Sequence, residues 1–147
     1  MTPAGTPPRQ PVHATTVARR CGAQWRGLML MGPSGSGKSD LALRLIDAGW
    51  RLVADDYSLV WASAGRLYAM SPATIEGRIE ARGLGIVRAH TRPMAQIAAV
   101  IACTAEPVER LPEPEVRVLD GVSVPLFRLN ALHASAATLA ARSLQTL

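Results

Sequence analysis

The chain of 147 residues is poor in several residue types, and each shortage excludes a class of protein. It has only two cysteines, Cys21 and Cys103, which follow no metal-binding spacing, so a disulfide-rich secreted domain is excluded and we interpret both as reduced thiols. It contains no run of about 18 apolar residues, and its first residues lack the apolar stretch of a secretory signal. We therefore expect a cytoplasmic protein with no membrane partner.

Lysine is almost absent, because Lys38 is the only lysine among sixteen basic residues and the others are arginines. Aromatic residues are also few, at 4% of the chain, and arginines such as Arg19, Arg20 and Arg26 are not interleaved with them. That pattern is typical of a solvated basic surface rather than a nucleic-acid interface, so we expect no nucleic-acid partner. The net charge of +5 would instead steer an anionic nucleotide or an acidic protein.

The length fits one domain with its own hydrophobic core. Residues 1–11 contain four prolines and show no apolar periodicity, which predicts a flexible tail before a domain at 12–147. Apolar residues make up 48% of the chain, mostly alanine, leucine and valine. This composition favours an α/β fold with a mainly β-sheet core flanked by helices.

Residue patterns place the expected elements along the chain. A helix is expected from Lys38 to a stop at Gly49, and a final helix at 135–147 with Ser135 as its N-cap. Residues 71–92 show no consistent period, and we interpret them as a functional loop region with short elements. Strands are expected at 12–18, 25–31, 51–54, 57–61, 66–70, 95–103, 116–119 and 122–129.

Between the second expected strand and the first helix lies a complete G-x-x-x-x-G-K-[ST] motif, the P-loop or Walker A motif. Its glycines let the backbone N–H groups point inward at phosphates, Lys38 reaches the β and γ phosphates, and the Ser39 hydroxyl can bind Mg²⁺. The motif predicts binding of a nucleoside triphosphate and a Mg²⁺-dependent phosphotransferase. Its residues are Gly32, Pro33, Ser34, Gly35, Ser36, Gly37, Lys38 and Ser39.

Asp55 and Asp56, the acid pair, directly follow the strand expected at 51–54. Carboxylates at that edge of a sheet would lie beside the phosphates, where metal binding or proton transfer is useful. Two aspartates after a strand are also common turn chemistry, so both interpretations stay open.

A second motif, residues 79–86, alternates acid, base and glycine as neither a helix nor a half-buried strand would. It is typical of a ligand-contacting loop, in which Glu80 completes a Mg²⁺ shell and Arg82 binds a transferring phosphoryl group. A surface ion pair between the two would use the same residues.

Taken together, the P-loop, the segment 51–56 after the first helix, and residues 79–86 resemble the catalytic domain of HPr kinase/phosphorylase, in the same order and with similar spacing. Residues 12–14 also resemble the family's strand with an active-site histidine. The resemblance implies that Asp56 takes the proton from an acceptor serine, that Ser39 and Glu80 bind Mg²⁺ with support from Asp55, and that His13 is an active-site residue. A half-buried strand histidine is the alternative for His13.

The resemblance further implies an ATP- and Mg²⁺-dependent kinase that phosphorylates a serine of the phosphocarrier protein HPr in regulation of the phosphotransferase system. By this resemblance we expect a form without the family's regulatory N-terminal domain. The family's later Pro-Gly-Arg-Asn stretch has only a loose counterpart around Arg128, so kinase activity is expected rather than the reverse phosphorylase activity. Full-length members form hexamers, and a homo-oligomer is one expectation here. Two other hypotheses are a nucleotide sensor without transfer and a kinase of a small metabolite.

Overall fold

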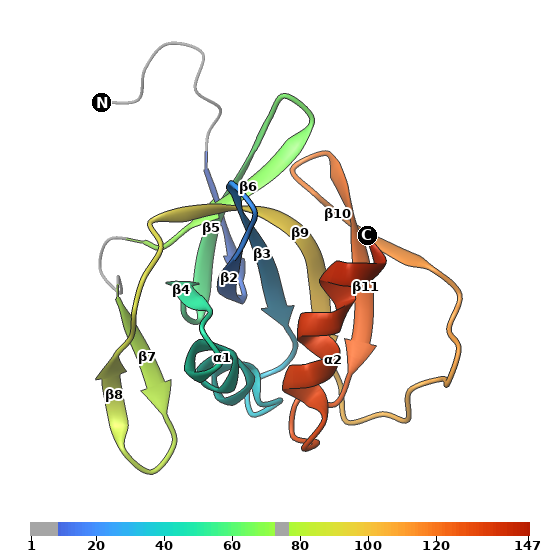
Figure 1. Ribbon diagram of the computed structural model, residues 1–147. Helices are drawn as coiled ribbons and strands as arrows, with labels where there is room; N and C mark the ends of the chain where they lie inside the picture. The colour runs from blue at the N-terminus through green and yellow to red at the C-terminus, as the bar shows by residue number, and fades with distance from the viewer. Residues whose placement is uncertain (1–8, 73–76) are drawn as a thin grey trace.

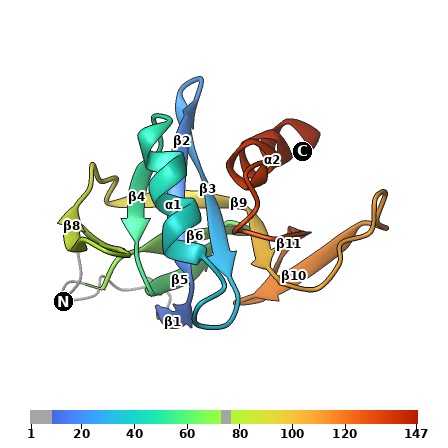
Figure 2. The ribbon, with the colours of Figure 1, turned by 90° about the horizontal axis from the view of Figure 1, so that it is seen from below.

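The computed structural model describes residues 9–72 and 77–147 and shows one mixed β-sheet with both helices on one of its faces (Figures 1 and 2). The sheet has nine strands, in the order β1-β5-β6-β9-β3-β2-β4, with β11 added beside β9 and β10 beside β11. This confirms the expected α/β class with a mainly β-sheet core. Its strands are β1 (Gln10–His13), β2 (Thr15–Cys21), β3 (Gln24–Met31), β4 (Arg51–Ala54), β5 (Tyr57–Ser63), β6 (Arg66–Met70), β9 (Met94–Cys103), β10 (Glu115–Leu119) and β11 (Val122–Leu129).

The helices are α1 (Lys38–Asp47), which follows the P-loop, and α2 (Ala136–Ser143), which continues into a 3₁₀ turn (Leu144–Thr146). Gly49 has φ 103°, a conformation that ends α1 as the sequence predicts. Ser135 occupies the N-cap position of α2, but its side chain makes no capping hydrogen bond. Neither helix in the described ranges is long and apolar enough to cross a membrane.

Two apolar clusters lie on opposite faces of the sheet, as the alternation of side chains along β3 illustrates. Leu28 and Leu30 pack into the cluster under α1 and α2, whereas Met29 packs into the cluster formed where the sheet curves toward β5, β6 and β10. On α1, Leu41 and Leu45 are fully buried, and each contributes about 1.5–3 kcal/mol of transfer free energy. This packing fixes the helix that carries Lys38 and Ser39 against the sheet.

The strand expected at 12–18 is wrong as a single element, because the chain bends at Ala14 and forms two strands. β1 pairs antiparallel with β5, and β2 pairs with β3 and β4. The chain therefore leaves β5 after His13 and joins β3 and β4 from Thr15 onward. β1 begins at Gln10, so residues 10 and 11 belong to an edge strand and not to the expected tail, whose first eight residues lie outside the described part.

The second motif also differs from its prediction, because it forms a two-stranded ribbon of β7 (Arg78–Ala81) and β8 (Gly85–Arg88). Ile79 and Ala81 are buried and Arg78 and Glu80 are exposed, so β7 is a half-buried strand after all. The ribbon packs through Ile79 into the cluster under α1. The contact between Ile79 and this cluster buries one face of β7, which the short, charged sequence did not predict.

Both cysteines are free thiols, as expected. Cys103, at the end of β9, is buried, and this burial raises its pKa to about 11 despite the opposing charge of Lys38. The thiol is therefore protonated at neutral pH and is an apolar packing group beside the P-loop rather than a nucleophile.

Candidate active site

The register of the sheet brings three segments together at one edge. β2 lies between β3 and β4 and runs antiparallel to both, so the start of β2 lies beside the carboxyl ends of its neighbours. Thr15 is opposite Leu30 of β3, and Thr16 is opposite Ala54 of β4. The P-loop follows β3 and the acid pair follows β4, so both emerge beside the residues that join β1 to β2.

The P-loop holds its lysine against its own backbone. Lys38 is only 7% exposed, and its Nζ donates hydrogen bonds to the carbonyl oxygens of Gly32 at 2.7 Å and Pro33 at 3.1 Å. The Ser36 hydroxyl is buried and has no hydrogen-bond partner among the described residues. An ammonium group and an unpaired hydroxyl donor in a glycine-rich loop suit a phosphate ligand, whose oxygens accept such hydrogen bonds.

Gly32 packs so closely against Cys103 and Ser36 that no side chain fits at this position. A Cβ at this position would lie 2.6 Å from the backbone oxygen of Cys103 and 2.9 Å from the Ser36 hydroxyl. We expect Gly32→Ala to lower the free energy of unfolding by about 1–3 kcal/mol more than Gly22→Ala, because overpacking against backbone cannot be relieved by a rotamer change. Gly22 also has a positive φ, at 64° against 152° for Gly32, but meets nothing within 4 Å, so it controls for the loss of a positive-φ glycine without a steric clash.

Urea denaturation followed by circular dichroism would measure this difference between the two alanine variants. Equal losses of stability would show that the contact between Gly32 and the end of β9 relaxes at no cost.

Asp55 is the buried member of the acid pair, at 9% exposure. Its Oδ1 accepts hydrogen bonds from the hydroxyls of Thr15 at 2.9 Å and Ser39 at 2.8 Å, and its Oδ2 accepts one from the Glu80 backbone N–H at 3.1 Å. Three donors fix the orientation of this carboxylate. Asp55 therefore links the P-loop helix, β2 and β7 at one point.

Asp56 differs from its neighbour in exposure and in backbone conformation. Its side chain is 65% exposed, and its φ of 65° lies in the left-handed region. The two consecutive carboxylates therefore have different partners. Its Oδ1 lies 3.0 Å from Nε2 of His13, whose side chain is 41% exposed. The structure thus brings His13 and Asp56 together, and an accessible carboxylate held by a histidine is suited to accept a proton from a substrate hydroxyl.

A cavity of about 340 Å³ opens between the acid pair and the β7–β8 ribbon. Its lining combines a serine hydroxyl from the P-loop, three acidic side chains and one arginine with two isoleucines. Its lining residues are Ser39, Asp55, Asp56, Arg78, Ile79, Glu80 and Ile86.

This donor set fits Mg²⁺, which takes oxygen ligands and is usually held by one or two carboxylates together with waters and substrate phosphates. Ser39, Asp55 and Glu80 line the cavity and offer a hydroxyl and two carboxylates. No group of three or more His, Cys, Asp or Glu within 9–72 and 77–147 is arranged to hold a metal by itself. A cation here would therefore depend on the nucleotide for further ligands.

Two arginines named from the sequence lie outside this cavity. Arg82 is exposed in the turn between β7 and β8, and no ion pair with Glu80 occurs among the described residues. Arg128, on β11, forms two hydrogen bonds to the Glu115 carboxylate at 2.8 and 3.1 Å and faces a different cavity. The arginine that lines the acidic cavity is Arg78.

Sequence reasoning missed Thr15 and Arg78. Arg78 lies two residues before Glu80 on the same face of β7, so strand alternation would have found it had the segment been predicted as a strand. Thr15 carried no comparable signal, because its contacts are to residues 40 and 41 positions away.

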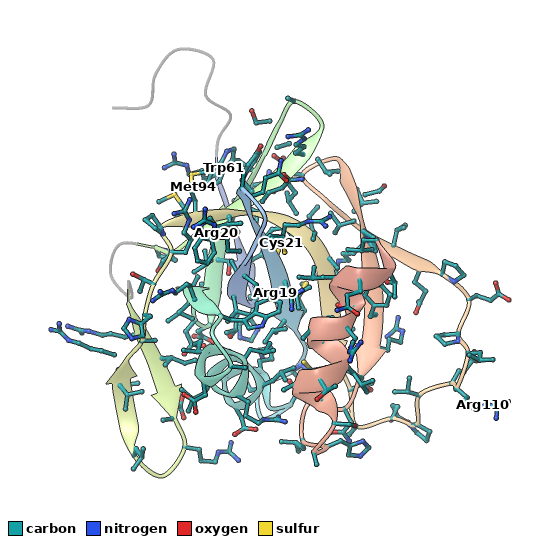
Figure 3. All side chains as sticks on the ribbon, viewed as in Figure 1. Arg19, Arg20, Cys21, Trp61, Met94 and Arg110 are labelled. Atoms are coloured by element: carbon teal, nitrogen blue, oxygen red, sulfur yellow. The ribbon has the colours of Figure 1, made fainter. Side chains whose placement is uncertain are left out.

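Three of the other arginines lie outside this cavity's lining and do not form one cluster. Figure 3 shows Arg110 at the outer tip of the loop between β9 and β10, well away from Arg19 and Arg20 on β2. Arg19 lies over the ring of Trp50, at 5.2 Å from its centroid, and so covers apolar surface.

Comparisons with known proteins match the part of the chain that contains most of these residues. A family model described as the HPr Serine kinase C-terminal domain matches residues 19–93, just over half of the chain, including the P-loop, the acid pair and the β7–β8 ribbon. An HPr kinase/phosphorylase of Clostridium tetani is 48% identical over 61 residues, which are 42% of this chain and 20% of that protein. One from Brevibacillus brevis is 42% identical over 66 residues, 44% of this chain and 21% of that protein.

The matched stretch therefore spans about a fifth of the length of these curated relatives. Among solved structures, the Hpr(Ser) kinase/phosphatase of Coxiella burnetii has a similar fold, with a TM-score of 0.77 over 93% of this chain and 95% of that chain at 22% identity. The chain belongs to the HPr Serine kinase C-terminal domain family.

Proposed function

We propose that the chain is a kinase that transfers the γ-phosphoryl group of ATP to a serine of the phosphocarrier protein HPr, with Mg²⁺ as cofactor and in the cytoplasm. The proposal follows the names of its relatives, which are HPr kinase/phosphorylases. The dispersed arginines favour a protein acceptor over nucleic acid.

The single observation that carries the proposal is the division of the acid pair. Asp55 is buried and hydrogen-bonded to the P-loop Ser39, whereas Asp56 is exposed and contacts His13, and both line the same cavity. Asp55 is thus suited to bind a metal beside the phosphates, and Asp56 is suited to accept a proton from an incoming hydroxyl. A phosphoryl transferase requires both functions within a few ångströms of its P-loop.

In the proposed reaction, the serine Oγ of the acceptor forms a bond to the γ-phosphorus, and the bond from that phosphorus to the oxygen shared with the β-phosphate breaks, releasing ADP. Asp56 takes the serine proton, and His13 orients the Asp56 carboxylate. Lys38 and the P-loop N–H groups hold the phosphates. Mg²⁺, when bound by Ser39, Asp55 and Glu80, neutralises phosphate charge.

We propose Arg78, which lines the cavity, as a phosphate contact, and Arg82 would contact a phosphate only if the turn between β7 and β8 moved toward the cavity. Because Arg128 is already paired with Glu115, we propose that the reverse phosphorylase reaction is weak or absent. A homo-oligomer is also proposed, and measurement of the molar mass in solution tests it.

The deciding experiment incubates the purified chain with Mg²⁺, γ-labelled ATP and HPr from the same organism. Label on HPr that disappears with a Ser→Ala acceptor would support the serine kinase. ATP binding without label on HPr would favour a nucleotide sensor, and label on a small hydroxylated compound but not on HPr would favour a metabolite kinase. A parallel reaction with labelled pyrophosphate identifies the donor.

A further inference from the structure

Thr15 contacts both members of the acid pair, the carboxylate of Asp55 and the backbone of Asp56. It is the first residue of β2, immediately after the bend at Ala14, and it is 0% exposed. A buried hydroxyl costs free energy unless it is hydrogen-bonded, so its partners explain its presence in the core. Both of its partners belong to the candidate active site.

The hydroxyl of Thr15 uses both of its hydrogen-bonding capacities. Oγ1 donates to Oδ1 of Asp55 at 2.9 Å and accepts from the backbone N–H of Asp56 at 3.3 Å. One atom therefore fixes the carboxylate of Asp55 and the backbone of Asp56, whose φ of 65° is a conformation that non-glycine residues adopt at a cost. A serine could make both bonds, whereas a valine of the same shape could make neither.

The neighbouring backbone strengthens this arrangement. The Ala14 N–H donates to the Asp56 carbonyl at 3.0 Å, so the bend between β1 and β2 also holds the backbone of the acid pair. The Ser39 hydroxyl and the Glu80 backbone N–H hold the Asp55 carboxylate as well. Residues of β2 and of the turn after β4 are thus locked together, although they are about 40 positions apart in sequence.

We infer that Thr15 is a positioning residue that holds Asp55 in its metal-binding orientation and Asp56 in its proton-accepting orientation at the same time. The inference rests on the proposed function for its effect on transfer, but its hydrogen bonds can be tested in the protein alone. Thr15 is fully buried and does not line the cavity, so it acts through the acid pair.

The test compares Thr15→Val and Thr15→Ser with Thr16→Val. Thr16 is the matched control, because it is also 0% exposed and adjacent on β2, but its hydroxyl bonds to the Ser58 hydroxyl at 2.7 Å and to neither aspartate. Any loss of activity common to both valine variants would report general damage to the core.

Two measurements separate the roles. Without nucleotide or metal, hydrogen exchange followed by NMR should show the Asp56 amide exchanging about tenfold faster in Thr15→Val and unchanged in Thr15→Ser and Thr16→Val, since only the first loses its acceptor. With Mg²⁺ and ATP, Thr15→Val should need about 10- to 100-fold more Mg²⁺ for half-maximal transfer, with kcat lowered and the KM for ATP within about twofold, as for other partners that orient metal ligands.

Recovery of both properties in Thr15→Ser would support the inference. It would be overturned if the Asp56 amide exchanged equally in both valine variants, or if Thr15→Val and Thr16→Val had the same Mg²⁺ dependence. If wild-type protein transfers nothing to HPr, the proposed function fails, while amide exchange and the Mg²⁺ dependence of ATP affinity still decide the role of Thr15.

Discussion

Replacing Asp56 with asparagine is expected to lower phosphoryl transfer by about 10²- to 10⁴-fold, the usual contribution of a general base. The amide cannot take the serine proton, but it keeps the size and shape of the carboxylate and can still bond to His13. Asparagine also tolerates the left-handed conformation at φ 65°, so the turn should persist. ATP affinity should therefore remain near the wild-type value.

The measurement is the single-turnover rate of transfer to HPr, together with ATP affinity by calorimetry. Asp47→Asn is the matched control, because Asp47 is exposed at the end of α1 and does not line the cavity. Transfer by Asp56→Asn at a rate close to that of Asp47→Asn would remove Asp56 from the role of base. A loss of ATP affinity as large as the loss of rate would instead indicate a binding role.

Replacing Lys38 with alanine is expected to weaken ATP binding about 10- to 100-fold, since a hydrogen bond to a charged group contributes about 1.5–3 kcal/mol. Transfer should fall further, because the ammonium also stabilises charge that develops on the phosphates. Lys38 is 7% exposed and already holds two P-loop carbonyls, so the loop would in addition lose its internal support.

Calorimetric titration with ATP measures the binding loss, and Arg66→Ala, which removes an exposed cation at the β5–β6 turn, controls for net charge. The composition offers an independent readout, because Lys38 is the only lysine. An amine-reactive reagent can modify only Lys38 and the N-terminus, and ATP should protect Lys38 from it. Unchanged ATP affinity in Lys38→Ala, or no protection by ATP, would contradict phosphate binding by this residue.

The parts of the fold and site that sequence reasoning predicted well are those whose determinants are local. The P-loop, the helix after it, β4 and the turn at the acid pair each depend on residues within one short window, so residue type and periodicity were sufficient. The sequence predicted a loop for the β7–β8 ribbon because its short strands carry charge and glycine, and the burial of Ile79 depends on α1.

The sequence by itself determined the phosphate-binding loop, the two carboxylates after β4 and the α/β character of the chain, because glycine spacing and side-chain periodicity act over a few residues. Only the tertiary structure decided that β1 turns at Ala14 to pair with β5 and that Thr15 contacts both acids. It also decided that Arg78 rather than Arg82 lines the cavity. These contacts follow from the pairing of strands about 40 residues apart, and such pairing is set by the packing of the whole sheet and not by any local pattern.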